Sequence, residues 1–446
     1  MTMGNLFYLL NLSVSGIKCI EKEVRLDFYK KTVDKDFNPE KYRVKAIYGE
    51  NGSGKSAIVT AVKIFRDLIM FENYLKETKT QIFLNEIINK KTQIFRLSCE
   101  FIVNASNPRN VYRYSIQLGK GGNGLFEIQQ EALEMKNGNY ANNNFKVIFE
   151  SRSGELAQIN CADNGKAWIA KRSINLLSSS SLVNIYTANV KELSSEDSRV
   201  DRDFLFHILM CSLLVIGLRV YIGEEDQHEF YFLQKRLRES RADNQALTEE
   251  IFADGSGLDI FSSVSDKIVD KEYFGKYKEK VDCLTRFIRI FKSDLVAIDI
   301  DAKENGDSYV CDLNLNYGDY VINKEFESTG IKKLIRLFDC FSAASNMGIV
   351  FVDEMDANLN DVYLCRLIEY FMYYGKGQLC FTTHNLDPMT VLKENRNSID
   401  FLSSDGHLVS WTSRGNALPD NCYRNGMIED SPFNIDATDF VGIFGE

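Results

Sequence analysis

The chain has 446 residues, 44% of them hydrophobic and 26% charged, and its formal net charge is −10. This composition is typical of a soluble globular protein with roughly two or three domain-sized units, and only 5 prolines argue against long disordered linkers. With this acidic balance the overall field does not steer the protein to nucleic acid, so any DNA contact requires a local basic patch.

The cysteines and the apolar segments predict the compartment. The 10 cysteines are scattered, and none form the Cys-x-x-Cys spacing of a zinc site. No basic segment followed by an apolar run marks a secretory signal near the N-terminus. The most apolar stretch, Phe204–Leu218, is shorter than the roughly 20 residues that span a bilayer. We therefore expect a cytoplasmic protein with free thiols, a buried helix at this stretch and no membrane segment.

The first elements read as strands. Leu6–Val14 and Glu23–Phe28 are apolar or alternating, and they surround a turn at Ser15–Cys19. Val44–Tyr48 is a short apolar run that leads directly into a glycine-rich loop. After the loop, apolar residues recur at helical spacing, namely Ala57, Ile58, Ala61, Val62 and Phe65. The order is therefore strand, loop, helix.

The next segment predicts antiparallel hairpins. Turn residues at Asn104–Asn110 and Gly119–Gly124 separate alternating runs. The expected strands are Phe95–Val103, Tyr112–Leu118, Phe126–Lys136 and Lys146–Glu150.

From about residue 201 to residue 291 the pattern becomes helical. Glu229–Ile251 predicts an amphipathic helix, Asp254–Gly257 breaks it, and Lys271–Phe291 resumes the helical spacing. Two alternatives fit: a projecting, coiled-coil-like hairpin, or a helical subdomain packed on the sheet.

After Leu295 strands and helices alternate again. Ile349–Val352 and Leu379–Thr382 predict short buried strands, with a helix over Val362–Tyr374 between them. The predicted organisation is an N-terminal lobe at 1–200, a helical insertion at 201–294, a C-terminal lobe at 295–412 and a tail without an assigned role at 413–446.

The glycine-rich loop at residues 49–56 matches G-x-x-x-x-G-K-[ST]. Glycines let backbone N–H groups turn inward around phosphate oxygens. Lys55 supplies a charge to the β- and γ-phosphates, Ser56 supplies a hydroxyl ligand for Mg²⁺, and the next helix directs its positive end at the same group. The predicted site for ATP and Mg²⁺ comprises Gly49, Glu50, Asn51, Gly52, Ser53, Gly54, Lys55, Ser56 and Ala57.

Two carboxylates follow the apolar strand at Ile349–Val352. In phosphate-loop enzymes an Asp at such a strand end helps to hold Mg²⁺, which predicts Asp353 as a metal ligand. The adjacent acid, Glu354, can orient and deprotonate the attacking water. The paired acids therefore predict a hydrolytic centre.

A histidine follows the next apolar strand, after Thr382 and Thr383. An imidazole at this position can contact the γ-phosphate or the attacking water. Its place about 30 residues after the acidic pair, at a strand end, favours function over a structural role. Lys55, Glu354 and His384 are the predicted catalytic residues.

Together these motifs resemble ABC-type ATPases of the SMC, RecF and OLD branch. The matching segments are residues 49–56, Val350–Glu354, Met355–Asn360, Thr383–His384, and the opening Leu12–Lys18 with Val24–Phe28. The resemblance covers roughly residues 6–150 and 295–412. It implies an α/β fold of the P-loop NTPase type: an ATPase head with a mixed central sheet, an antiparallel β subdomain and a helical insertion. Asp356 would lie in the D-loop, and His384 would be the switch histidine.

ATPases of this kind carry a signature loop, usually Leu-Ser-x-Gly. Here Glu327-Ser328-Thr329-Gly330 ends 23 residues before Asp353, with Glu327 replacing the leucine. Ser328 is a predicted helix N-cap. The resemblance implies that Ser328 and Gly330 bind ATP held by a second subunit, giving a homodimer through an ATP sandwich or a larger homo-oligomer. Gln81 and Gln93 are both candidates for the Q-loop.

The biological role follows from the resemblance alone. It implies an ATPase like the stand-alone subunits of PARIS-type and Septu-type antiphage systems, a sensor or scaffold that controls a separate nuclease or toxin. The alternative is a RecF- or SMC-like ATPase of DNA repair or chromosome maintenance that acts directly on DNA, which the acidic balance disfavours. The divergent signature and the central insertion disfavour a transporter subunit.

Asp299 and Asp301 invite a nuclease interpretation. Alternation along a strand would instead place both on one solvated face. The 62 residues after His384 are too few for the TOPRIM domain of OLD nucleases, so we expect no nuclease chemistry in this chain.

Overall fold

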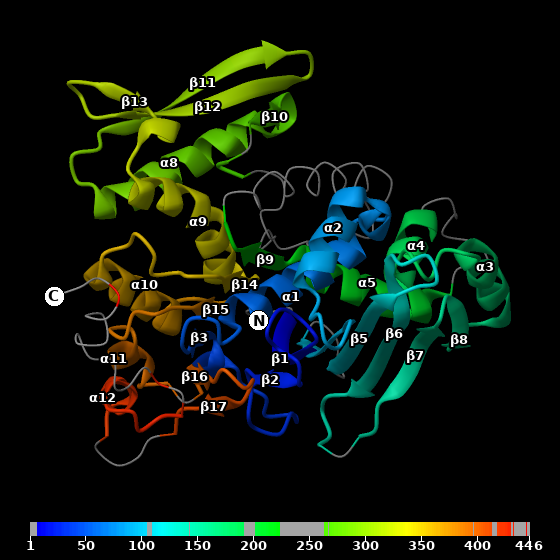
Figure 1. The fold of residues 1–446 in the computed structure, drawn as a ribbon. Coiled ribbons are helices and arrows are strands. Elements are labelled where there is room, and N and C mark those ends of the chain that lie inside the picture. The colour runs from blue at the N-terminus through cyan, green and yellow to red at the C-terminus, as the bar shows by residue number, and fades with distance from the viewer. Residues whose placement is uncertain are drawn as a thin grey trace.

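The computed structural model is a mixed α/β protein with three β-sheets (Figure 1). It describes residues 7–104, 109–141, 143–190, 201–223, 263–265, 267–395, 397–412, 417–429, 431 and 443. No helix in these ranges is both long enough and apolar enough to cross a membrane. The predicted helix Glu229–Ile251 and the break after it lie outside the described residues. The same holds for the 413–446 tail, except for residues 417–429, 431 and 443.

The strands are β1 (Phe7–Ser15), β2 (Val24–Asp27), β3 (Val44–Tyr48), β4 (Ile94–Val103), β5 (Asn110–Lys120), β6 (Phe126–Asn137), β7 (Lys146–Arg152), β8 (Glu155–Ile159), β9 (Leu218–Tyr221), β10 (Ile268–Asp270), β11 (Ala297–Asn305), β12 (Ser308–Asn316), β13 (Val321–Asn323), β14 (Ile349–Val352), β15 (Gln378–Thr382), β16 (Ile399–Leu402) and β17 (Leu408–Ser410). The α-helices are α1 (Lys55–Met70), α2 (Thr78–Ile87), α3 (Asp163–Ser173), α4 (Leu182–Val190), α5 (Arg202–Ile216), α8 (Phe274–Phe291), α9 (Thr329–Asn346), α10 (Asp361–Tyr373), α11 (Met389–Leu392) and α12 (Pro419–Arg424). The 3-10 helices are η1 (Glu40–Tyr42), η2 (Tyr74–Lys76), η3 (Lys271–Tyr273) and η4 (Lys324–Phe326).

The central sheet has six strands in the order β17-β16-β3-β15-β14-β9. All neighbouring pairs are parallel except β16 and β17. Along β14, Ile349 and Phe351 enter one core, whereas Val350 and Val352 enter the core on the opposite face. Because both faces are buried, this strand reads as an unbroken apolar run rather than an alternating one.

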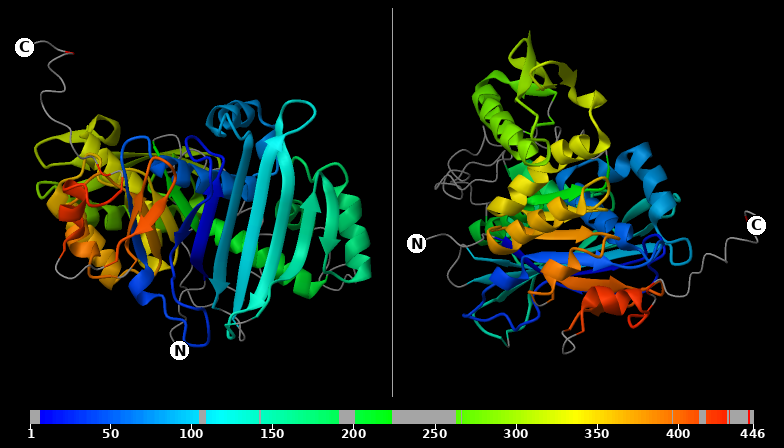
Figure 2. Two further views of the ribbon diagram at one scale, coloured as in Figure 1. Left: turned by 60° about the horizontal axis from the view of Figure 1, so that its bottom comes forward. Right: turned by 90° about the vertical axis from the view of Figure 1, so that its left-hand side faces the viewer.

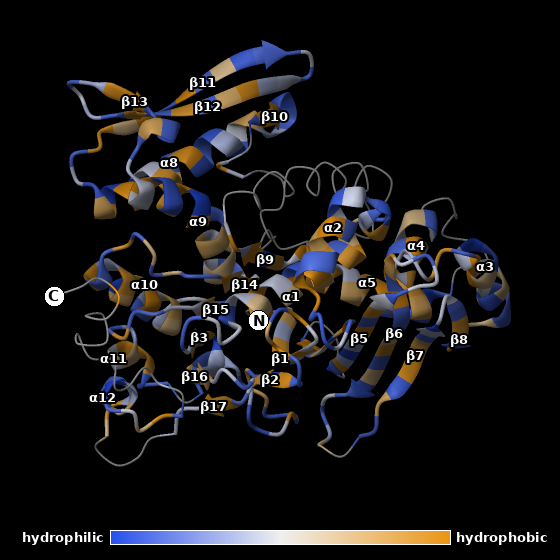
Figure 3. Ribbon diagram, viewed as in Figure 1, coloured by the Kyte–Doolittle hydropathy of each residue, from blue (hydrophilic) through white to orange (hydrophobic). Residues whose placement is uncertain are grey.

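A seven-stranded antiparallel sheet in the order β2-β1-β4-β5-β6-β7-β8 lies beside the central sheet (Figure 2). In β5 and β6 apolar and polar residues alternate along the strand (Figure 3). The apolar face shares one core with helix α1 and one face of the central sheet, as Phe101, Ile58 and Phe351 illustrate. Helix α1 is therefore covered on two sides, which fixes the start of the helix relative to both sheets.

The side chain of Gln378 ties the two sheets together. Its amide oxygen accepts from the Leu9 backbone N–H at 2.6 Å, and its amide nitrogen donates to the Leu9 carbonyl at 3.0 Å. The pairing imitates one rung of a β-ladder where β1 carries a register shift between Leu9 and Asn11. Gln378 begins β15, so this contact anchors a strand whose other end carries Thr383 and His384.

The third sheet has the order β10-β12-β11, with β13 paired to β12, and it projects from the rest of the molecule with α8 (Figure 1). The first turns of α9 pack on this sheet through Ile331 and Leu334. The later turns pack on the central sheet through Leu337 and Phe341. Helix α9 therefore connects the projecting unit to the central sheet.

The sequence predicts a helical segment at 201–294, but this range also contains two short strands, so the prediction is wrong there. The buried helix predicted over Phe204–Leu218 corresponds to α5, but Leu218 begins β9, an edge strand of the central sheet paired with β14. Ile268–Asp270 is a strand paired with β12. The missed strand directly follows an apolar helix, and an apolar run alone does not distinguish a buried helix from a buried strand. The central sheet thus draws strands from the ranges 1–200, 201–294 and 295–412.

Candidate functional site

The carboxyl ends of three neighbouring parallel strands, β3, β15 and β14, meet at one edge of the central sheet. The glycine loop follows β3, the paired acids follow β14, and Thr383 and His384 follow β15. Ligands of open α/β sheets bind outside the carboxyl ends of the strands. The fold therefore brings the two distant parts of the sequence to the edge where a ligand is expected.

The glycine loop has the backbone shape that its residues predict. Gly49, Gly52 and Gly54 have φ values of 155°, 86° and 105°. A Cβ on Gly49 would lie 2.3 Å from the Leu402 carbonyl oxygen and 2.7 Å from Ser53 Oγ, so no larger residue fits there. Helix α1 begins at Lys55, so the N–H groups of its first turn lie at the end of the loop.

Lys55 lies inside the loop and is only 6% exposed. Its ammonium group donates to the carbonyl oxygens of Gly49 at 2.7 Å and Glu50 at 2.8 Å. Burial lowers the pKa of Lys55, and the carboxylates of Asp353, Glu354 and Asp356 act in the opposite direction. The acids after β14 therefore lie close enough to Lys55 for their charges to affect its pKa.

The other loop residues differ in their exposure. Glu50 is half-buried and Asn51 is exposed. Ser53 is buried, and its hydroxyl has no hydrogen-bond partner within the described residues. Ser56 is half-buried on the first turn of α1, and Ala57 is fully buried beneath it. An unsatisfied buried hydroxyl in a loop of this shape is a group that can still bind a ligand.

Thr382 holds the two acids after β14. Its hydroxyl donates to Asp353 Oδ1 at 2.5 Å and accepts from the Glu354 backbone N–H at 2.8 Å. Asp353 is 6% exposed, whereas the Glu354 side chain is exposed. Glu354 has a φ of 46°, a left-handed conformation that costs about 1–3 kcal/mol for a residue other than glycine. The left-handed conformation turns the chain directly after Asp353.

His384 and Asp356 belong to the same electrostatic group. Desolvation and the Lys55 charge lower the pKa of His384, while Asp356, Glu354 and Asp353 act in the opposite direction. Asp356 has a buried carboxylate oxygen that has no hydrogen-bond partner among the described residues. The hydroxyl of Tyr48, at the end of β3, is also buried and has no hydrogen-bond partner among them. The predicted residues from all three strand ends are therefore within electrostatic reach of one another.

The signature-like segment lies at the start of α9. The Ser328 hydroxyl caps the helix by accepting from the Ile331 N–H at 3.4 Å. A Cβ on Gly330 would lie 2.7 Å from the Asn358 carbonyl oxygen, so the first turn of α9 rests directly on the loop after Asp356. Within the described residues, no hydrogen bond links Ser328 or Gly330 to residues 49–57.

Glu327 accepts two hydrogen bonds at the start of the signature-like segment. Its carboxylate accepts from the Ser328 N–H at 2.9 Å and from the Tyr317 hydroxyl. Tyr317 lies just after β12, so Glu327 fixes the signature-like segment to the projecting sheet.

Sequence reasoning missed Lys333 as a residue of this site. It is 7% exposed, and its ammonium group donates to the backbone carbonyls of Glu354 at 2.5 Å and Ala357 at 2.9 Å. Burial lowers the pKa of Lys333, and Asp356, Glu354 and Asp353 act in the opposite direction. A signal was present, since Lys333 heads a row of buried apolar residues at helical spacing, namely Leu337, Cys340 and Ala344.

The side-chain amides of the two Q-loop candidates, Gln81 and Gln93, form hydrogen bonds with backbone groups outside this site. The Gln81 amide donates to the carbonyls of Leu75 and Phe126 and accepts from the Phe126 N–H, which fixes α2 to β6. Gln93 donates to the Lys90 carbonyl at 2.8 Å. Both amides therefore hold local backbone.

Asp299 and Asp301 lie exposed on β11 and point to one side of the strand, as alternation predicts. Asp299 accepts from Asn316 at 3.1 Å, and Asp301 lies 4.0 Å from Lys303. Their partners are surface groups of the same sheet, as expected for a solvated face.

Comparisons with known proteins give only distant likenesses. No protein-family model matches the chain, and no curated protein matches it. Among solved structures it is similar to the recombination mediator protein RecF of the RecFOR pathway. The RecF-ATPrS structure has 12% identity and a TM-score of 0.42, covering 92% of this chain and 100% of that one. The RecF-ATP structure has 13% identity and a TM-score of 0.38, covering 91% and 100%.

Proposed function

We propose that this chain is an ABC-type ATPase that binds and hydrolyses ATP at the edge formed by β3, β14 and β15. The supporting observation is that β3, β15 and β14 are neighbouring parallel strands, so Lys55, the acids after β14 and His384 come to one edge of the sheet although they are far apart in the sequence. A glycine-rich loop ahead of a helix, a buried lysine and paired acids at a strand end are the parts that phosphoryl-transfer sites require.

The residues present fit a nucleoside triphosphate. The positive φ values of the loop glycines, the unsatisfied Ser53 hydroxyl and the buried Lys55 ammonium together provide donors for phosphate oxygens. Lys55 is held by loop carbonyls, which are weaker partners than the charged oxygens of a phosphate. ATP would replace these carbonyls as the partner of Lys55.

Ser56 and Asp353 fit a magnesium ion, which prefers oxygen ligands and retains several waters. When bound, Mg²⁺ supplies charge neutralisation for the phosphate oxygens. Thr382 holds the Asp353 carboxylate in a fixed orientation for this task.

The other residues have separate roles in the proposed reaction. Glu354 is exposed and can accept the proton of an attacking water, which makes it the general base. His384, with its lowered pKa, is mainly neutral near pH 7 and can orient that water or donate to the γ-phosphate. Lys55 neutralises charge that develops on the phosphate oxygens.

We infer a homodimer that forms around ATP. The N-cap residue Ser328 and the close approach of Gly330 to Asn358 present the start of α9 next to Asp356. An exposed helix N-terminus favours an anion, and the phosphates held by a second copy would supply one. ATP would then favour the closed dimer, because only the closed form adds these contacts.

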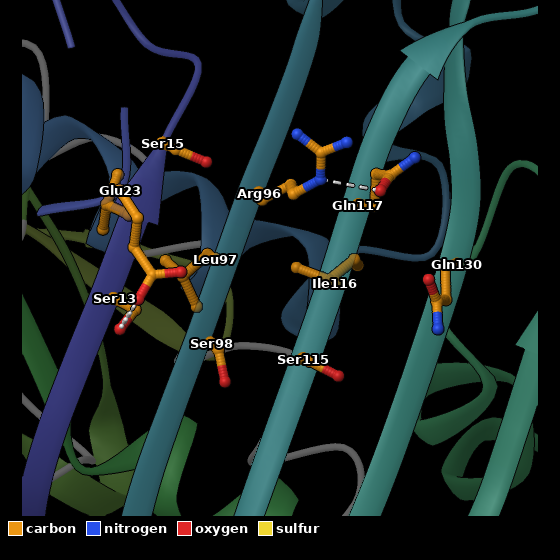
Figure 4. Close-up of a pocket in the computed structure, with 11 residues that line it drawn as sticks. Ser13, Ser15, Glu23, Arg96, Leu97, Ser98, Ser115, Ile116, Gln117 and Gln130 are labelled. Atoms are coloured by element: carbon orange, nitrogen blue, oxygen red, sulfur yellow. Dashed lines mark hydrogen bonds between the residues drawn. The ribbon is translucent and has the colours of Figure 1, made fainter. Parts of the chain in front are cut away.

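Direct action on DNA is the weaker alternative. The outer face of the antiparallel sheet carries a shallow hollow of about 200 Å³ (Figure 4), lined mainly by serines, glutamines, Glu23 and Arg96. Arg96 donates to Gln117, and Glu23 accepts from Ser13. With one arginine and one glutamate, this hollow lacks the excess of positive charge that phosphate binding requires, and the net charge of −10 adds to the argument.

The proposed biological role is therefore the control of a separate effector, a nuclease or toxin, by an ATP-dependent oligomer in antiphage defence. Support for it comes from the motif set and the Glu-Ser-x-Gly segment of the sequence. Co-purification of the protein encoded next to this one, released on ATP hydrolysis, tests this role.

Glu354→Gln tests the ATPase assignment. The substitution keeps the size of the side chain and removes the base, so hydrolysis should fall by about 10²–10⁴-fold. ATP binding should persist, and dimers or larger assemblies should accumulate with ATP and Mg²⁺. Hydrolysis rates and the particle mass by light scattering provide the two measurements, and unchanged hydrolysis would reject the assignment of Glu354.

A further inference from the structure

Lys333 lies between the start of α9 and the loop that carries Glu354. It comes five residues after Ser328 and is almost fully buried. Its ammonium group donates to main-chain carbonyls, those of Glu354 and Ala357, at 2.5 Å and 2.9 Å. Because its partners are backbone groups, the lysine fixes the path of the chain rather than the position of one carboxylate.

The loop that Lys333 holds is bent at two points. Glu354 has a φ of 46° and Asn358 a φ of 62°, both in the left-handed region. Such conformations persist only where surrounding contacts impose them. On one side the contacts come from Thr382, and on the other side they come from α9 through Lys333 and Gly330.

The first turns of α9 and residues 354–358 therefore form one packed unit. The Gly330 Cα lies so close to the Asn358 carbonyl that a methyl group would not fit between them. Lys333 adds two hydrogen bonds one turn further along the helix. A shift of α9 relative to the central sheet must move the Glu354 backbone, because the buried ammonium cannot lose both carbonyls without a partner.

We propose that Lys333 is a positioning residue that couples the start of α9 to the general base of the same subunit. The inference rests on the proposed function, in which the Ser328 end of α9 faces ATP held by the second copy. Through Lys333, occupancy of the partner's nucleotide site sets the position of Glu354 in this subunit. Hydrolysis then requires both sites to be filled, although each Glu354 acts only on its own water.

The coupling predicts a defined kinetic signature. Lys333→Met keeps the length and apolar stem of the side chain but removes the donors. ATP affinity should change little, since Lys333 has no hydrogen bond to residues 49–57 in the described part of the chain. The kcat should fall by about tenfold to a hundredfold, because misplacing a catalytic group by about 1 Å has this effect. The cooperative dependence of hydrolysis on ATP concentration should be lost.

Lys332 provides the matched control. It is the neighbouring lysine of α9, is half-buried, and donates to the Glu325 carbonyl at 3.3 Å, away from the acids. Lys332→Met should keep the kcat, ATP affinity and cooperativity of the wild type. Lys333→Gln, which is shorter but remains polar, serves if the methionine variant does not fold, and it should show the same kcat loss with unchanged ATP affinity.

The experiment measures ATP hydrolysis against ATP concentration, and fluorescent ATP binding, for the full chain and these variants. A wild type that neither binds nor hydrolyses ATP overturns the proposed function, and this inference with it. If the wild type and Lys332→Met are active, a Lys333 variant with wild-type kcat and cooperativity overturns the inference alone. A Lys333 variant that has lost ATP binding also overturns it, since Lys333 would then be part of the binding site.

Discussion

The hydroxyl of Thr382 donates to the Asp353 carboxylate over 2.5 Å, joining the ends of the parallel strands β14 and β15. The same oxygen accepts from the Glu354 N–H. One side chain on β15 thus sets the orientation of the proposed metal ligand and the backbone of the proposed base. Both acids depend on a residue from the strand that carries His384 towards the same edge.

Thr382→Val should damage both stability and hydrolysis. Valine has the same shape but leaves the Glu354 N–H and the Asp353 oxygen without their partner, at a cost of about 1–3 kcal/mol. We expect hydrolysis to fall by about tenfold or more because both acids lose their orientation. Steady-state rates and urea unfolding measure the two effects. Thr382→Ser, which retains the hydroxyl, should stay near wild type in both, and equal loss in the two variants would contradict the role of the hydroxyl.

Cys19 offers a chemical probe of the glycine loop. It is exposed, and its thiol donates to the Gly52 carbonyl at 3.0 Å. ATP bound in the loop should slow alkylation of Cys19 by iodoacetamide, because the thiol lies beside the proposed phosphate site. Cys283, also exposed but on α8, should react at the same rate with and without ATP. Mass spectrometry of the alkylated peptides reads out both rates, and equal protection of the two thiols would argue against a local effect.

The buried ion pair of Lys45 and Asp400 holds β3, the strand that leads to the glycine loop, against β16. The charged atoms lie 2.6 Å apart, and the side chains are 2% and 0% exposed. Lys45→Met should destabilise the fold by about 3–5 kcal/mol, since it leaves a buried carboxylate without its cation. The double variant with Asp400→Leu should recover part of that loss.

The exposed pair of Arg25 and Asp27 is the control for this prediction. Its side chains are 50% and 36% exposed, so Arg25→Met should cost at most about 1 kcal/mol. Denaturant midpoints measure the whole series. A loss from Lys45→Met no larger than that from Arg25→Met would show that the buried pair contributes little.

Glu131 should make stability depend on pH. It is fully buried in the antiparallel sheet and accepts from Tyr114, Ser181 and the Leu182 N–H. Burial raises the pKa of Glu131 above its ordinary value of 4.5, and the hydrogen bonds only partly oppose this. The folded state therefore binds this proton more tightly than the unfolded state. Its contribution to stability is complete below about pH 4.5 and is lost as the pH rises through the raised folded value.

Glu131→Gln removes this titration. The difference in unfolding free energy between wild type and variant should therefore change as the pH rises above about 4.5, with the wild type losing more stability than the variant. Urea unfolding at several pH values measures it. Parallel curves for the two proteins would show that Glu131 does not titrate in this range.

The sequence was sufficient to predict the strands that carry the candidate site, but not the contacts that hold the loops after them. The spacing of residues 49–56 and the apolar runs before Asp353 and His384 place the chemistry at strand ends, and these runs correspond to β3, β14 and β15. Strands β4 to β7 lie where alternation and turn residues predict them. These signals are local, so a single sequence carries them.

What the sequence could not give depends on long-range packing. Strand β9 has four residues directly after an apolar helix, and only its pairing with β14 identifies it as a strand. The helical spacing places Lys333 in the buried row of α9, but the sequence does not show that the carbonyls of Glu354 and Ala357 are its partners. From the sequence Gln81 is a candidate for the Q-loop, but in the structure its amide is hydrogen-bonded to the backbone of Phe126.

The most direct test of the central claim is equilibrium binding of ATP, with Mg²⁺, to the wild type and to Lys55→Ala by calorimetry. Lys90→Ala, at an exposed lysine near Glu86, is the control. The wild type and the control should bind ATP alike, and Lys55→Ala should bind at least about a hundredfold more weakly, a loss of about 2.7 kcal/mol. A wild type that does not bind ATP, or a Lys55→Ala variant that binds it as tightly as the wild type, would contradict the claim.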